Sequence, residues 1–106
     1  MTAPAPRVEM IDSVLTVSGE VDGDSVVALR KQGETLLNTV NVDLVVDLGT
    51  LKTASSVVLS LLLCWQRLAN RRGVSLSYRG VSERLASLAA LSNLDDQLSG
   101  FSSGSA

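Results

Sequence analysis

The sequence contains no histidine and a single cysteine, Cys64. Histidine is the most frequent general base near neutral pH and the most frequent ligand of transition metals, so its absence removes the commonest catalytic designs. One cysteine can form neither an internal disulfide nor a cysteine metal site, and Cys64 lies in an apolar run where a packed thiol is expected. We therefore expect no enzyme activity, no catalytic residues, no metal and no cofactor.

Aromatic residues, net charge and long apolar runs are also scarce. Phe, Trp and Tyr occur once each although 45% of the 106 residues are hydrophobic, which predicts an aliphatic core without rings that stack on bases. The net charge of −2 attracts neither nucleic acid nor anionic lipid. The longest apolar stretch, 57–65, is too short to span a membrane, and the first ten residues contain no hydrophobic signal region. We expect a cytoplasmic protein that binds no nucleic acid and does not insert into a membrane.

The hydrophobic periodicity predicts seven elements in the order β-β-α-β-α-β-α. Strands are expected over 8–11, 13–18, 42–48 and 74–78, and helices from Asp22 or Asp24 to about Asn38, over 56–72 and over 82–91. A tight turn joins the first two strands. Strands separated by helices require right-handed crossovers and a largely parallel sheet. The fold class is therefore α/β, with a central mixed, mostly parallel sheet of four to five strands and helices mainly on one face.

One domain is expected over 8–98. The Pro/Ala-rich segment 1–7 and the Ser/Gly-rich segment 99–106 are typical of disordered ends. The almost continuously apolar strand over 42–48 is typical of a central strand buried on both faces. The inward stripes of the outer helices are expected to comprise Val26, Leu29, Gly33, Leu36, Leu37 and Val40 in the first, and Leu85, Leu88 and Leu91 in the third.

Two charged clusters flank helix ends. They are the acidic residues Glu20, Asp22 and Asp24 before the first helix, and the basic residues Arg67, Arg71 and Arg72 at the end of the central helix. Carboxylates at a helix start bind free amide groups, and cations at a helix end complement its dipole. We favour these structural roles over a metal site and a phosphate site, respectively.

The helix over 56–72 is apolar on nearly every side. At 100° per residue, one stripe forms the expected core face: Val58, Leu61, Leu62, Trp65 and Leu68. Val57 and Leu59 then lie on other sides of the first turn. Either this helix is unusually enclosed, or one flank contacts another protein. A domain of this size has a single core and cannot easily bury a helix all round, which favours the second interpretation.

Ser55 and Ser56 stand where the central helix begins. One of them can be the N-cap, which is a sufficient reason for serine at this point. A hydroxyl at a helix N-terminus is also well placed to receive a phosphate or to hydrogen-bond a partner, because free amide groups stabilise negative charge there. The residues alone leave both roles open.

Three stretches of the chain resemble the STAS domain family, the fold of anti-sigma-factor antagonists and of the cytoplasmic tails of sulfate transporters. They read GEVDGDSVVALR, VDLVVDLGTLKTASS and RGVSERLASLAALSNL, and the resemblance covers about residues 8 to 98. Ser56 falls on the hydroxyl that is phosphorylated in the antagonists. Ser55 stands where they carry aspartate, and Val57 departs from the small residue that normally follows.

Within the family, the loop and the apolar helix look closer to the STAS subunits of Mla-type phospholipid ABC transporters of the Gram-negative inner membrane. That resemblance implies a non-catalytic accessory subunit that binds an MlaF-like cytoplasmic ATPase subunit and, through it, a membrane-embedded permease. The implied partner-binding residues are Thr53, Ser55, Ser56, Val57, Leu59 and Ser60. The alternative is an anti-sigma-factor antagonist switched by phosphorylation at Ser56. An exposed apolar patch here could also pair two copies weakly.

Overall fold

A computed structural model describes residues 6–94 and 97–98. The first strand begins at Arg7, one residue before the expected start of the domain. Residues 1–5 and 99–106, which hold most of the two segments expected to be disordered, lie outside the described residues.

The order of the elements confirms the predicted string. The elements are β1 (Arg7–Ile11), β2 (Val14–Ser18), α1 (Val26–Leu37), β3 (Leu44–Asp47), α2 (Ser56–Arg72), β4 (Leu76–Arg79) and α3 (Glu83–Leu91). The ends of α2 are as predicted, because Gly73 takes the left-handed conformation (φ 73°) that ends a helix. Ser82 caps α3 by accepting a hydrogen bond from the Leu85 amide at 3.1 Å.

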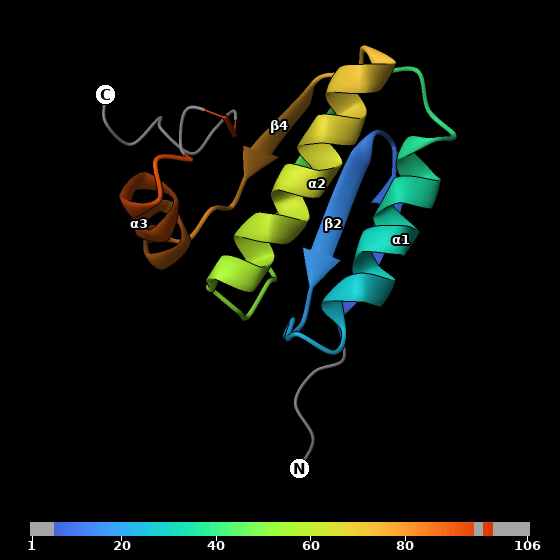
Figure 1. Cartoon of the computed structure of the whole chain (residues 1–106). Helices are drawn as coiled ribbons and strands as arrows, with labels where there is room; N and C mark the ends of the chain where they lie inside the picture. Colours follow the sequence, from blue (N-terminus) through green and yellow to red (C-terminus); the bar gives the residue numbers. More distant parts are fainter. Residues whose placement is uncertain (1–5, 95–96, 99–106) are drawn as a thin grey trace.

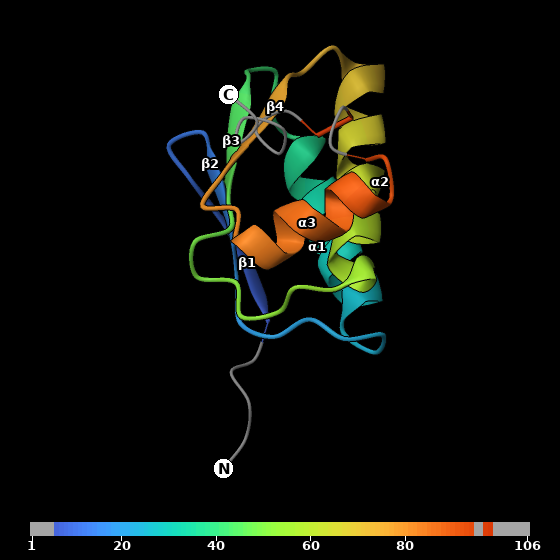
Figure 2. The ribbon, with the colours of Figure 1, turned by 90° about the vertical axis from the view of Figure 1, so that its left-hand side faces the viewer.

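The sheet has four strands in the order β1-β2-β3-β4. β1 and β2 form an antiparallel hairpin, and the β2–β3 and β3–β4 pairs are parallel. Asp12 and Ser13 both have positive φ, as a two-residue hairpin turn requires. The helices lie to one side of the sheet (Figure 2), and α2 lies between α1 and α3 (Figure 1). This arrangement confirms the expected fold class.

The expectation that the strand over 42–48 is buried on both faces is wrong. β3 is shorter, Val42 before it is 54% exposed, and within β3 only Leu44 and Val46 are buried. Val45 and Asp47 point to the opposite face and are half-buried. Two right-handed crossovers that step in the same direction across a sheet place both helices on the same face, so the described helices leave the other face uncovered.

The packing of α1 on α2 centres on Trp65, which is fully buried. A Cβ atom added at Gly33 of α1 would overlap the Trp65 ring, so glycine provides the notch that accepts it. The Trp65 indole Nε1–H donates to the backbone oxygen of Arg30 at 3.2 Å. Gly33 therefore sets how closely the two helices approach.

One member of the predicted stripe in α3 is misplaced. Leu91 is 82% exposed, whereas Leu85 and Ala89 are buried. Six residues of helix rotate the chain by about 240°, so Leu91 cannot share a face with Leu85, whereas Ala89, four residues on, can. Leu98, beyond the end of α3, is fully buried.

We predict that Gly33→Ala destabilises the protein although alanine favours helix formation. The new methyl group must displace the Trp65 ring, and overpacking of this kind costs about 1–3 kcal/mol, more than the helix propensity of alanine returns. Urea denaturation measures the change. Gly23→Ala is the matched control, because a Cβ there meets no atom within 4 Å, and an unchanged midpoint for both variants would contradict the notch.

Candidate functional site

The loop between β3 and α2 begins with a set of hydrogen bonds around Asp47. Its carboxylate Oδ1 accepts from the Gly49 amide at 2.8 Å, and Oδ2 accepts from Arg79 Nε at 3.1 Å. The bond from Gly49, together with Arg79, holds the pKa of Asp47 below its ordinary value. The Leu48 amide donates to the backbone oxygen of Arg79 at 2.9 Å, which fixes the start of the loop against the end of β4.

The second half of the loop is tied to the chain that leaves β2. The Gly19 amide donates to the Thr50 oxygen at 3.3 Å, and the Lys52 amide donates to the Gly19 oxygen at 2.8 Å. Thr53, expected to contact a partner, accepts a hydrogen bond through Oγ1 from the Val21 amide at 2.8 Å. Its hydroxyl therefore holds two loops together.

The helix start has an unusual cap. Ser55 takes the N-cap position with extended backbone angles, and its backbone oxygen accepts from the amides of Val58 and Leu59. Its side chain makes no capping hydrogen bond, and the first turn of α2 carries no acidic residue. Serine is thus present at the cap without the interaction that usually explains it, and the positive end of the helix dipole has no carboxylate in that turn.

The structure divides the six predicted partner-binding residues into three groups. Ser56 and Ser60 are exposed, Thr53, Ser55 and Val57 are half-buried, and Leu59 is buried at 2% exposure. Placing Leu59 on an exposed flank was therefore wrong. α3 packs against α2 on the side away from α1 (Figure 1), so the inward face is wider than one stripe. Much of the apolar helix is enclosed within the monomer. The surface that remains at its start consists mainly of serine hydroxyl groups, and Val57 there is half-buried against the core.

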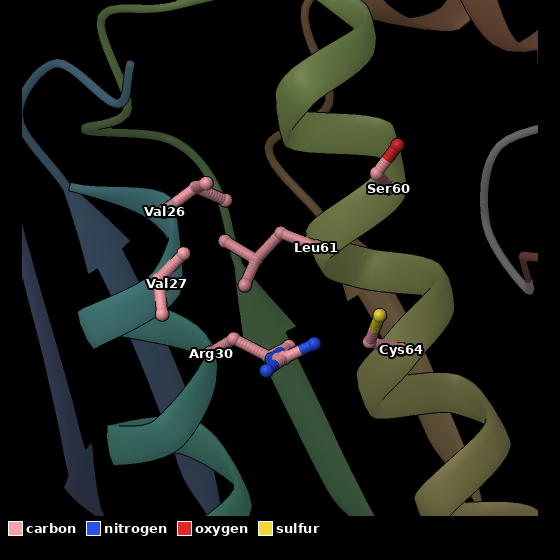
Figure 3. Close-up of a pocket in the computed structure, with 6 residues that line it drawn as sticks. All are labelled: Val26, Val27, Arg30, Ser60, Leu61 and Cys64. Carbon is pink, nitrogen blue, oxygen red and sulfur yellow. The ribbon is translucent and has the colours of Figure 1, made fainter. Parts of the chain in front are cut away.

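A hollow between α1 and α2 lies beside this surface (Figure 3). Val26, Val27 and Arg30 of α1 and Ser60, Leu61 and Cys64 of α2 line it. Its volume of about 130 Å³ is below that of sites for drug-sized ligands and suits a single side chain. The sequence analysis did not predict this hollow. Val27, which lines it, is a large hydrophobic residue that is 50% exposed.

One member of each charged cluster makes structural hydrogen bonds, as the sequence favoured for the acidic cluster. Asp22 Oδ1 accepts from the amides of Asp24 and Ser25, at 3.0 and 2.8 Å, just before α1. Arg72 Nη2 donates to the backbone oxygen of Val40 at 2.9 Å. Within 6–94 and 97–98, no group of three histidine, cysteine, aspartate or glutamate residues could hold a metal ion. Over the same residues, no helix is both long and apolar enough to cross a bilayer.

Comparison with known proteins defines the family. The family model described as "Mlab, STAS domain" matches residues 6–100, so the chain belongs to the STAS domain family. No sequence among the curated proteins matches it.

Solved structures share the fold. The chain is similar to the anti-sigma factor antagonist SpoIIAA in its unphosphorylated form, with a TM-score of 0.71, 19% identity, and 91% of this chain and 87% of that chain covered. It is also similar to an anti-sigma factor antagonist from Mycobacterium paratuberculosis, with a TM-score of 0.62, 28% identity, and 89% and 81% covered. A protein from Thermotoga maritima gives a TM-score of 0.72 at 16% identity, with 89% and 83% covered.

We predict that Asp47→Asn lowers the free energy of unfolding at neutral pH by about 1 kcal/mol, because a charged acceptor of the Gly49 amide is lost. The folded-state pKa of Asp47 is depressed, so its contribution is present above the unfolded value of 3.8 and is lost as pH falls through the folded value. Denaturation of both proteins from pH 7 to acid should therefore show a difference that shrinks with acidification.

Arg79→Gln separates the two partners of Asp47. The Arg79 side chain is 58% exposed, so this variant should lose less stability than Asp47→Asn. A larger loss for Arg79→Gln, or a difference for Asp47→Asn that grows in acid, would contradict this assignment.

Proposed function

We propose that this protein is a non-catalytic accessory STAS subunit of an Mla-type phospholipid ABC transporter. It binds the MlaF-like ATPase subunit, and through it the permease, at the cytoplasmic face of the membrane, and it supports assembly or activity of the complex. Ser55, Ser56, Ser60 and Val57 form the contact surface at the start of α2. Thr53 supports that surface through the hydrogen bond that it accepts from the Val21 amide, and Leu59 belongs to the core.

The observation that carries the proposal is that the hydroxyl groups of Ser55 and Ser56, at the start of α2, take no part in capping the helix, while the loop before them is held in place. The Ser55 side chain does not cap α2, and Ser56 is exposed beside it. The hydrogen bonds that Asp47 accepts from the Gly49 amide and Thr53 accepts from the Val21 amide hold the preceding loop, so little conformational entropy is lost when a partner binds. The family model that matches carries the Mlab description, which favours this branch of the family.

The hollow between α1 and α2 extends the same surface. Ser60 belongs both to the exposed start of α2 and to the wall of the hollow. A protruding apolar side chain of the ATPase subunit would fit its apolar walls, and such small, desolvated pockets give anchor residues much of their binding energy. The proposed contact surface therefore consists of the polar start of α2 and the adjacent, mainly apolar hollow.

The second candidate is an anti-sigma-factor antagonist that is switched by phosphorylation at Ser56. Exposure of Ser56 at a helix start without a first-turn carboxylate favours it, since a phosphate there would bind free amides without like-charge repulsion. Ser55 and Val57, which replace the aspartate and the small residue that the resemblance predicts at these positions, count against it.

Co-expression with the ATPase subunit tests the first proposal. Ser56→Arg and Ser60→Arg should each lower the yield of co-purified ATPase at least about tenfold, equivalent to about 1.4 kcal/mol, because a long charged side chain keeps the two surfaces apart. Ser87→Arg on α3 is the matched control, since Ser87 is also an exposed helical serine. Wild-type yield for both variants would refute the surface. Leu59→Asp is not informative, because it buries a charge and unfolds the domain.

The mass of the intact protein separates the two functions. An accessory subunit should keep its unmodified mass in cells under every growth condition. A phosphatase-sensitive phosphate adduct that disappears in Ser56→Ala would instead support the antagonist.

A further inference from the structure

β1 forms one edge of the sheet, and no strand within the described residues pairs with its outer side. The inner side of β1 pairs with β2, and α1 packs against β1. An edge strand presents unpaired amide and carbonyl groups, which can join a further strand.

The pairing of the inner strands identifies which groups of β1 point outward. The Val45 amide donates to the Ser13 oxygen at 3.0 Å, so the odd-numbered residues of β2 bond to β3 and the even-numbered residues bond to β1. These even-numbered residues pair with the odd-numbered residues of β1. The backbone groups of Val8 and Met10 therefore point away from the sheet, toward solvent.

The side chains of β1 carry alternating charge on the face opposite the helices. Arg7 and Glu9 form an ion pair with each other, and they are 68% and 47% exposed. An antiparallel copy of β1 centred on Val8 would set each Arg7 opposite the Glu9 of the other chain. These would be non-hydrogen-bonded pairs, in which facing side chains lie closest. The strand is thus complementary in charge to itself in one register.

Charge also excludes the neighbouring register. A pairing centred on Glu9 would set the two Glu9 carboxylates against each other, and like charges directly opposite are destabilising. A pairing centred on Met10 would bring Val8 opposite Asp12, which lies in the hairpin turn with positive φ. Only the register centred on Val8 satisfies both the outward backbone groups and the charges.

The helical side of the same edge has an open hollow. Val8 of β1 lines it together with Gln32, Thr35 and Leu36 of α1. In the register centred on Val8, the two Val8 side chains would meet between the two α1 helices and cover this hollow. Apolar surface would then be buried on one side of the joined strands, and an alternating set of four charges would form on the other.

We propose that two copies of this chain associate through β1, antiparallel and centred on Val8, to form a continuous eight-stranded sheet. The two-fold axis is perpendicular to the sheet, so the helices of both copies lie on one side. The strand is short and Pro6 ends the ladder because it lacks an amide donor, so the dimer is weak and depends on concentration and salt. The surface shares no residue with the start of α2, so a dimer offers two copies of the proposed docking site.

A charge-swap experiment tests the pairing. Sedimentation equilibrium of the wild-type chain, from micromolar to millimolar concentration, should show a reversible dimer. Arg7→Glu and Glu9→Arg should each weaken self-association at least about tenfold, because two attractive facing pairs become repulsive. Their equimolar mixture should form a heterodimer tighter than either variant alone, and the double variant should dimerise like the wild type.

Val8→Pro tests the backbone part of the pairing independently. Its amide points outward, so proline removes no hydrogen bond of the β1–β2 ladder, and edge strands tolerate proline. This variant should be monomeric with an unchanged circular dichroism spectrum. A wild-type chain that stays monomeric at millimolar concentration overturns the proposal. So does a dimer that persists in Val8→Pro or in both single charge variants, which would place the contact elsewhere, for example at the start of α2.

Discussion

The contact between Trp65 and Gly33 is the constraint on which the rest of the structure depends. The largest side chain of the core lies in α2, and α1 can approach it only where a residue without a side chain leaves room. Interiors are packed as densely as organic crystals, so this contact fixes the separation of the two helices. Their separation in turn determines the width of the hollow lined by Val26 and Ser60 and the exposure of the α2 start.

A second constraint acts on the candidate site through the loop between β3 and α2. Asp47 and Thr53 each bind a backbone amide with a side-chain oxygen at 2.8 Å. Together with the bridge between Gly19 and Leu51, they fix the loop on both sides before α2 begins. The serines at the helix start are therefore held by groups that do not themselves form the surface. A rigid support with a small polar face is typical of a protein that acts by binding.

The sequence was sufficient for the fold because local signals and periodicity agree. Gly73 and Ser82 mark a helix end and a helix start unambiguously, and the alternation in the strands is clear. The interior of the site was less accessible to sequence reasoning. A single hydrophobic stripe predicts that Leu59 is exposed, whereas the structure buries it. The tertiary contacts of α2, among them its packing against α3, are not encoded in the local periodicity. Helices on one face of the sheet were expected, and only the apolar composition of 42–48 was misleading, because β3 is buried on one face alone.

The bond between Thr53 and the Val21 amide also changes how mutational data on this protein should be read. A threonine in the middle of a recognition loop would ordinarily be scored as a direct contact when its loss abolishes binding. Here its oxygen is already engaged within the chain, so truncation would release two connecting segments and leave an amide unsatisfied. A defect at this position would report lost preorganisation, and only neighbouring side chains that face solvent would map the footprint of the proposed partner.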